Sequence, residues 1–218
     1  MLLEVTGLKA SYARREVLHG LDIAVDKGDV VAVIGPSGSG QTTLLRTLNF
    51  LEPADAGSLF FAGDSHDMAH MKRADILAIR RRTAFVFQNY NLFLNKTALE
   101  NITEGLVVGR GMNKAQARER AMALLSRFGL SGREDAYPSE LSVGQQQRVA
   151  IARALAPEPD IVYFDEPTSA LDPELTHEVL EILRTLAHEG LTMIVVTHEL
   201  AFARGIASRV LFMEEGTV

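Results

Sequence analysis

The sequence has no cysteine, no long apolar run and no excess of positive charge. Without cysteine, disulfide bonds and thiolate metal sites are excluded, which agrees with a reducing compartment. The apolar stretches fall short of the roughly 18 residues that a membrane-spanning helix needs, and the first residues lack the pattern of a secretory signal. The net charge of −6 gives no support to a nucleic-acid partner, whose usual binding face is basic. Together these features predict a soluble protein of the cytoplasm.

The apolar patterns alternate between strand and helix along a chain that is long enough to bury a large core. Val30–Ile34 and Ile161–Phe164 are apolar at every position, which is typical of central parallel strands covered on both faces. We expect one domain over the whole chain, in which residues 1–88 and 158–218 form an α/β core and residues 89–157 form an inserted helical subdomain. The sheet of this core should be mainly parallel, with an antiparallel β layer built from the N-terminal strands.

A glycine-rich turn follows the first apolar run and has the sequence Gly35-Pro36-Ser37-Gly38-Ser39-Gly40-Gln41-Thr42. Its glycines permit a tight loop whose backbone N–H groups point at one anion, and the helix that follows adds the positive end of its dipole. Thr42 places a hydroxyl where a Mg²⁺ ligand is needed. Gln41 stands where the pattern G-x-x-x-x-G-K-[ST] has lysine. The order of strand, turn and helix still predicts a phosphate-binding loop and the P-loop NTPase fold class.

Two local patterns near this loop carry further expectations. The apolar stripe of the helix after the turn continues to Leu51, and we expect Pro53 to end that helix. His66 and His70 are spaced like a metal-binding pair beside Asp67, but we expect a solvated surface stretch there.

A pair of carboxylates, Asp165 and Glu166, directly follows the second apolar run. In a P-loop enzyme the aspartate at this place helps to hold Mg²⁺, and an adjacent carboxylate can take a proton from the attacking water. A helix cap beyond a strand would also explain the pair. The glycine-rich turn upstream favours the catalytic interpretation.

Six motifs in a fixed order make the chain resemble the ATP-binding subunit of ABC transporters over essentially its whole length. They are the glycine loop at 35–42, Gln88 after a strand, Leu141-Ser142-Val143-Gly144-Gln145, Asp165-Glu166-Pro167, Ser169-Ala170-Leu171-Asp172 and Thr197-His198-Glu199. Within the family, the likeness is greatest to importers of polar amino acids, through Phe87–Phe93, Tyr137–Glu140 and Val196–Arg204.

This resemblance implies a role for each matching position. Tyr12 would stack on adenine, although a packed strand tyrosine is the alternative. The loop itself would bind the ATP phosphates through Gly35, Ser37, Gly38, Ser39, Gly40, Gln41, Thr42 and Thr43. Mg²⁺ would be held by Thr42, Gln88 and Asp165. Glu166 would be the general base, His198 the γ-phosphate sensor, and Gln88 a contact to the attacking water.

The resemblance also implies partners. In this family two ATP-binding subunits close on two ATP molecules, so that Ser142, Gly144 and Gln145 would cap the ATP of the other subunit and Asp172 would touch that subunit. We therefore expect a homodimer on the inner face of the cell membrane. It would contact integral permease subunits through the Gln88 loop and the helical subdomain, and a solute-binding protein only indirectly.

The chain departs from the family pattern at two positions. Gln41 is neutral where lysine brings a full charge to the β- and γ-phosphates, so we expect weaker nucleotide binding and hydrolysis slowed by on the order of a hundredfold or more. Val143 replaces a glycine of the signature; valine resists positive φ and adds bulk, and we expect a milder effect.

These residues are compatible with two functions. The first is an ATPase that powers solute import through a permease, with polar amino acids as the solutes. The second is a nucleotide-gated module that dimerises on ATP with little or no turnover, because Gln41 replaces the lysine. A DNA-repair or chromosome-organising protein would need a long coiled coil between Gln88 and Leu141, and that interval shows no heptad pattern.

Overall fold

The structure is a computed structural model that describes residues 1–13 and 15–218, and these residues form two compact units. The core unit consists of Met1–Phe85, Asp160–Glu166 and Arg184–Val218. The helical unit consists of Val86–Pro159 and Pro167–Leu183. Among the described residues, no helix is both long and apolar enough to span a bilayer.

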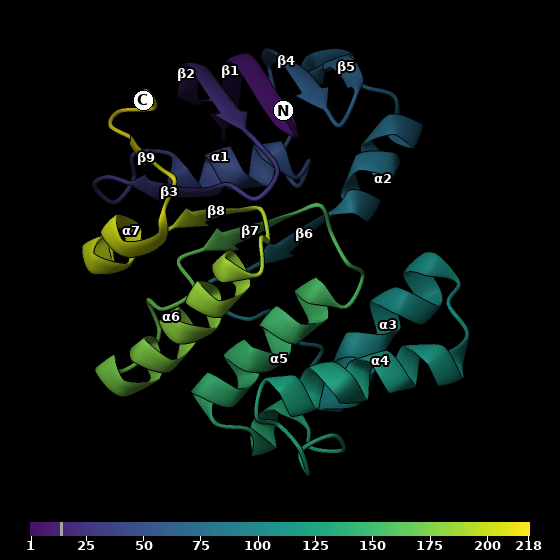
Figure 1. Ribbon diagram of the computed structural model, residues 1–218. Coiled ribbons are helices and arrows are strands. Elements are labelled where there is room, and N and C mark those ends of the chain that lie inside the picture. Colours follow the sequence, from purple (N-terminus) through teal and green to yellow (C-terminus); the bar gives the residue numbers. More distant parts are fainter. Residues whose placement is uncertain (14) are drawn as a thin grey trace. The chain divides into compact units, whose positions relative to one another are not determined.

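Two sheets make up the core unit (Figure 1). The first is antiparallel in the order β2-β1-β4-β5, and its strands are β1 (Leu3–Tyr12), β2 (Arg15–Val25), β4 (Ala56–Phe61) and β5 (Asp64–Asp67). The second has the order β6-β7-β8-β3-β9, and its strands are β3 (Val30–Ile34), β6 (Thr83–Val86), β7 (Ile161–Asp165), β8 (Met193–Val196) and β9 (Arg209–Phe212). The strands β7, β8, β3 and β9 pair in parallel. The predicted parallel sheet and antiparallel layer are therefore both present.

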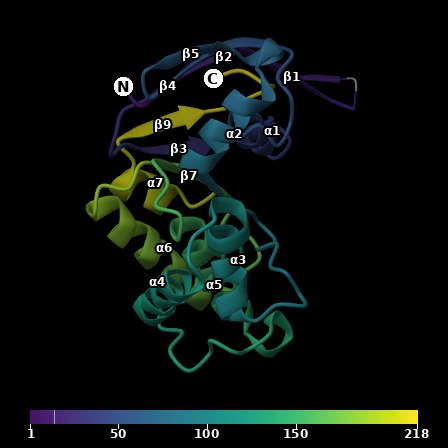
Figure 2. The ribbon, with the colours of Figure 1, turned by 90° about the vertical axis from the view of Figure 1, so that its right-hand side faces the viewer.

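Helix α1 (Gln41–Leu48) packs against both sheets of the core unit, and Figure 2 shows it below the antiparallel strands. Its buried leucines, Leu44, Leu45 and Leu48, belong to one apolar cluster with residues of β1, β2, β3, β7 and β8. Burying a leucine side chain contributes roughly 1.5–3 kcal/mol, so this cluster anchors the helix firmly. The start of α1, where the glycine loop ends, is thereby fixed to the carboxyl end of β3.

The end of α1 corrects the sequence-based expectation. The helix stops at Leu48, well before Pro53, because Phe50 adopts a left-handed conformation with φ of 54°. The Leu51 N–H then donates to the Arg46 carbonyl at 2.8 Å, which is the hydrogen bond of a Schellman motif. Asn49 holds this turn, because its side chain accepts a 2.7 Å hydrogen bond from the buried hydroxyl of Thr83.

The remaining helices of the core unit lie around its sheets. They are the short 3₁₀ turn Met68–His70, α2 (Arg73–Arg82) and α7 (Leu200–Ile206). His70 is exposed and lies 3.0 Å from Asp67. Among the described residues, no group of three or more His, Asp or Glu side chains is placed to hold a metal ion.

The helical unit is built from α3 (Ala98–Arg110), α4 (Lys114–Arg127), α5 (Val143–Leu155) and the first part of α6 (Pro173–His188). Helices α3, α4 and α5 pack on one another, as Figure 1 shows. Thr97 begins α3 with a capping box to Glu100, and Asn113 begins α4 by accepting from the Ala115 N–H at 2.8 Å.

The last turn of the chain, Met213–Thr217, holds the glycine loop against β2. Gly216 donates its N–H to the Ser39 carbonyl at 3.0 Å, and its own carbonyl accepts from the His19 N–H at 3.0 Å. A Cβ on Gly216 would lie 2.0 Å from the Val17 carbonyl oxygen. No side chain fits there without moving the backbone.

We predict that Gly216→Ala lowers the free energy of unfolding by about 2–4 kcal/mol, because it combines a backbone clash with left-handed strain. Gly190→Ala is the matched control, since Gly190 has a similar φ of 82° but open space around its Cβ position. Urea unfolding followed by circular dichroism measures both. Equal losses in the two variants would show that the clash at Val17 contributes nothing.

Candidate functional site

The glycine loop lies between β3 and α1 with its backbone packed against the last turn of the chain. Gly35 is the tightest point, because a Cβ there would lie 2.0 Å from the Met213 carbonyl oxygen. Gly40 caps α1 in a left-handed conformation, and none of the described side chains caps this helix. The first N–H groups of α1 are therefore left for an external acceptor, which is the arrangement that binds anions at helix starts.

Two buried polar side chains in this loop have no hydrogen-bond partner among the described residues. They are Ser39, through its Oγ, and Gln41, through its Nε2. Gln41 is only 6% exposed, so its amide has little access to water. A buried donor without a partner costs about 1–3 kcal/mol, and an anion in the loop would supply the missing acceptor. The loop therefore fits a phosphate group even without lysine at position 41.

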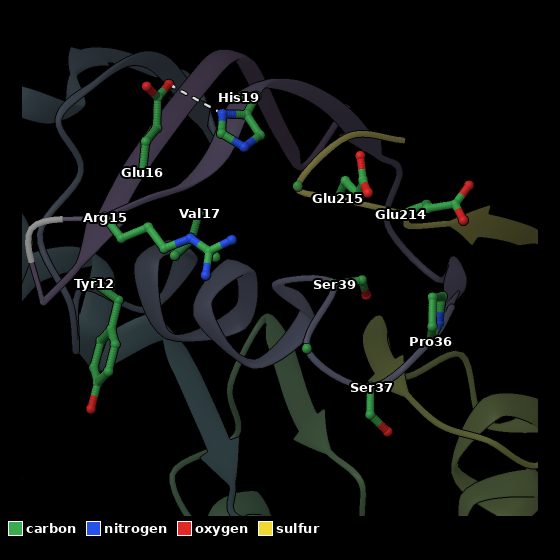
Figure 3. Close-up of a pocket in the computed structure, with 12 residues that line it drawn as sticks. Tyr12, Arg15, Glu16, Val17, His19, Pro36, Ser37, Ser39, Glu214 and Glu215 are labelled. Carbon is green, nitrogen blue, oxygen red and sulfur yellow. Dashed lines mark ion pairs between the residues drawn. The ribbon is translucent and has the colours of Figure 1, made fainter.

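A cavity of about 890 Å³ extends from this loop along β2 (Figure 3). Tyr12 stands at its far end with more than half of its surface exposed, so it is not a packed core tyrosine. An exposed aromatic face beside a cavity of this size suits stacking on a planar base. The lining residues come from three segments: Tyr12, Arg15, Glu16, Val17 and His19; Pro36, Ser37, Gly38 and Ser39; Glu214, Glu215 and Gly216.

Thr42 and Asp165 meet at the start of α1. The Thr42 hydroxyl donates to Asp165 Oδ1 at 2.9 Å, and Asp165 is almost fully buried at the end of β7. Burial raises the pKa of Asp165, although the hydrogen bond from Thr42 and the charge of Arg46 act in the opposite direction. A buried carboxylate beside a hydroxyl is a hard-oxygen site that Mg²⁺ fits, provided that the phosphates of a nucleotide and water supply the other ligands.

Glu166 and His198 form a second pair. Glu166 Oε1 lies 3.3 Å from His198 Nε2, and Glu166 has a positive φ of 46°. A glutamate rarely adopts this backbone conformation, which costs on the order of 1–3 kcal/mol and is most often found at functional sites. The turn is held by the Glu166 N–H, which donates to the Val196 carbonyl at 3.1 Å.

The other predicted site residues lie in the helical unit. Gln88 donates from Nε2 to the Ser169 hydroxyl at 2.9 Å, so the structure joins two of the six motifs there. Asp172 begins α6, where its carboxylate accepts from the Leu175 N–H at 2.9 Å. Gly144 packs closely on Leu175, because a Cβ on this glycine would lie 2.8 Å from that side chain.

The segment Leu141–Gln145 forms the start of α5. Ser142 and Gln145 make a capping box: the Gln145 N–H donates to Ser142 Oγ at 3.3 Å, and the Ser142 N–H donates to Gln145 Oε1 at 3.0 Å. Val143 is the first helical residue, and its φ is not positive. Valine is thus free of backbone strain here and adds only exposed apolar surface.

The comparisons with known proteins agree with this geometry. The family model described as ABC transporter matches residues 18–169. The chain belongs to the ABC transporter family. Over the whole chain, 52% of residues are identical to a probable amino-acid ABC transporter ATP-binding protein of Haemophilus influenzae, of which 86% is covered. Identity is 51% to the L-cystine transport system ATP-binding protein of Escherichia coli, over 99% of this chain and 88% of that protein.

Solved ABC cassettes share the fold. One is a dimeric post-hydrolysis state of an ATP-binding cassette bound to ADP and Pi, with a TM-score of 0.86 and 32% identity over 100% of this chain and 96% of that one. Another is a dimeric bacterial ABC transporter cassette with a TM-score of 0.87 and 33% identity over the same shares. The predicted fold class and family are therefore confirmed. Members of this family bind and hydrolyse ATP.

Sequence reasoning about this ABC cassette missed Arg15, His19 and the turn at Glu214–Gly216 as pocket residues. The turn reaches the loop only through a strand pairing, which no local sequence pattern marks. Strand β9 pairs in parallel with β3, with Phe212 opposite Ile34, so the residues after Phe212 reach the same sheet edge as Gly35. Arg15 and His19 gave no signal, because only the hairpin of β1 and β2 brings them to the loop.

For the ABC signature segment, we predict that Ser142→Ala lowers the free energy of unfolding by about 1 kcal/mol through loss of the helix cap. Ser142→Asp should retain most of the stability, since aspartate caps as well as serine does. Urea unfolding measures both variants. An unchanged stability in Ser142→Ala would contradict the capping role.

Proposed function

We propose that this chain is the ATP-binding and ATP-hydrolysing subunit that powers import of polar amino acids through a membrane permease. The observation that carries the proposal is the loop at 35–42, where uncapped helix N–H groups and the buried amide of Gln41 lack acceptors beside the Thr42–Asp165 pair. The names of the relatives, which include amino-acid and cystine transport proteins, support the choice of solute.

In the first step the core unit binds ATP. Tyr12 stacks on the adenine, and the triphosphate lies along the glycine loop, where the N–H groups at the start of α1 and the amide of Gln41 donate to its oxygens. The loop residues from Gly35 to Thr43 thus bind by their backbone more than by their side chains. We therefore expect a chain without the lysine to hold a nucleotide as well.

Thr42 and Asp165 would hold Mg²⁺ through their oxygen atoms, and Gln88 is the third residue proposed to reach it. When bound, Mg²⁺ supplies positive charge to the phosphate oxygens. The burial of Asp165 strengthens its interaction with a cation, because the surrounding dielectric is low.

Hydrolysis requires a base and a group that keeps the base in place. The Glu166 carboxylate accepts the proton of the attacking water, and His198, at 3.3 Å, limits the orientations that this carboxylate can adopt. The left-handed backbone conformation of Glu166 sets the direction of its Cα–Cβ bond. A neutral imidazole has a single N–H, so in the ATP-bound state this group donates to a γ-phosphate oxygen in place of Glu166. Gln88 helps to orient the water.

The catalyst is completed by a second copy of the chain. Ser142, Gly144 and Gln145 at the start of α5 cap the ATP of the partner subunit, and Asp172 contacts that subunit. Two solved cassettes with this fold are dimeric, which supports the homodimer. The permease binds the Gln88 loop and the helical subdomain of residues 89–157, and so holds the dimer at the inner face of the membrane.

A second candidate function is favoured by one observation. Gln41 carries no charge where the family pattern has lysine. The missing charge weakens the stabilisation of the transition state more than it weakens the binding of ATP. The chain would then form a dimer when ATP binds, and this dimer would dissociate only slowly. Such a nucleotide-gated module would control a permease by occupancy and not by turnover.

We predict that Gln41→Lys raises the rate of ATP hydrolysis by about a hundredfold, because an ammonium group restores charge at the β- and γ-phosphates. Steady-state phosphate release by the purified protein measures the effect. Gln41→Met is the matched control, since it keeps the length but removes the donor, and it should bind ATP more weakly than the unaltered chain. If the unaltered and lysine-bearing proteins release phosphate at the same rapid rate, the reduced-turnover alternative is refuted.

A separate prediction concerns Glu166→Gln made together with Gln41→Lys. Removing the base should abolish phosphate release while ATP binding persists, so that dimers accumulate in the presence of ATP. Light scattering coupled to size exclusion measures the dimer, with ADP as the control nucleotide. Persistence of rapid hydrolysis would exclude Glu166 as the general base.

A further inference from the structure

The cavity beside the glycine loop has an unusual balance of charge for a site that takes a triphosphate. Three of its lining side chains are carboxylates: Glu16 on β2, and Glu214 and Glu215 in the last turn. Lysine is absent from the loop because position 41 is glutamine. An anion with several charges therefore needs a positive group from elsewhere in the cavity.

Two lining residues can supply such a group, and they differ in their surroundings. His19 Nδ1 lies 3.4 Å from Glu16 Oε1, so any charge on this imidazole is already opposed. The guanidinium of Arg15 makes no ion pair or hydrogen bond with another residue of the described chain. A guanidinium stays protonated at any ordinary pH and offers several donors in one plane.

The position of Arg15 matches this need. It is the first residue of β2 and is paired with Tyr12 across the hairpin. Figure 3 shows its side chain extending from β2, with the guanidinium between Tyr12 and Ser39 in that view, and Arg15 is one of the residues that line the cavity. Tyr12, Arg15 and the glycine loop line the same cavity, so a nucleotide that stacks on Tyr12 and reaches the loop occupies the space that Arg15 lines.

We propose that Arg15 binds the phosphate chain of the nucleotide and supplies part of the positive charge that Gln41 lacks. This inference rests on the proposed function, since it assumes ATP in the cavity. Arg15 acts on binding through its charge and its donors. Its contribution should therefore grow with the number of phosphates and shrink when a lysine is returned to the loop.

The test is calorimetric titration of the purified full chain with ATP, AMP and adenosine. We expect Arg15→Gln to weaken ATP binding by about three- to tenfold, a range set by the solvent screening of an exposed charge. AMP binding should weaken less, and adenosine binding should not change. Arg15→Lys should recover part of the ATP affinity, because it restores the charge without the planar donors.

Lys27→Gln is the matched control for net charge. Lys27 is exposed in a turn of the core unit and does not line the cavity, so its loss should leave ATP affinity unchanged. In a chain that also carries Gln41→Lys, Arg15→Gln should weaken ATP binding by a smaller factor than in the unaltered chain. Thermal unfolding of each variant shows whether the fold is retained.

The outcomes separate the two proposals. If the unaltered chain binds no ATP, the proposed function is wrong and this inference fails with it. If the unaltered chain binds ATP and Arg15→Gln binds it equally well, only the role of Arg15 is refuted. Equal weakening of ATP and adenosine by Arg15→Gln would also refute it, because the side chain would then act on the base or on the fold.

Discussion

The site depends on close main-chain packing around the glycine loop. The Met213 carbonyl lies where a Cβ of Gly35 would be, and Gly216 bonds to Ser39 on one side and to His19 on the other. Backbone contacts of this kind leave little room for the loop to move, so its shape is set before a ligand binds. Leu44, Leu45 and Leu48 fix the other end of the loop by burying α1. A preformed cradle of this kind binds anions without first ordering a flexible segment.

Preorganisation explains why loss of the lysine need not destroy the site. The backbone N–H groups and the buried amide of Gln41 are already positioned. The free-energy cost of removing these donors from water was incurred when the chain folded, and not when a ligand binds. What glutamine cannot supply is charge, and charge matters most where negative charge moves during the reaction. Binding and turnover should consequently respond differently to position 41. The same distinction makes a cation elsewhere in the cavity, such as Arg15, useful for binding without making it a catalyst.

Most of the fold was predictable because its signals are local. The wholly apolar strands, the glycine loop and the cap at Asn113 each follow from residues close together in sequence. The end of α1 was predicted wrongly, since Pro53 looked like the stop signal while a buried bond from Thr83 to Asn49 holds the turn earlier. That bond joins residues 34 positions apart, and no sequence pattern marks it. The pocket residues of β2 were missed for the same reason.

The motif residues of the helical unit also stabilise the fold, in addition to the roles proposed for them. Ser142 and Gln145 cap α5, Asp172 caps α6, and Gly144 leaves room for Leu175. A substitution at any of these positions disturbs a helix start in the monomer as well as the proposed contact to a second subunit. Loss of activity alone therefore cannot assign such a residue to the ATP of the partner. Only a variant that keeps the cap, such as aspartate for Ser142, separates the two effects, because an added carboxylate repels a phosphate while it still accepts from the helix N–H.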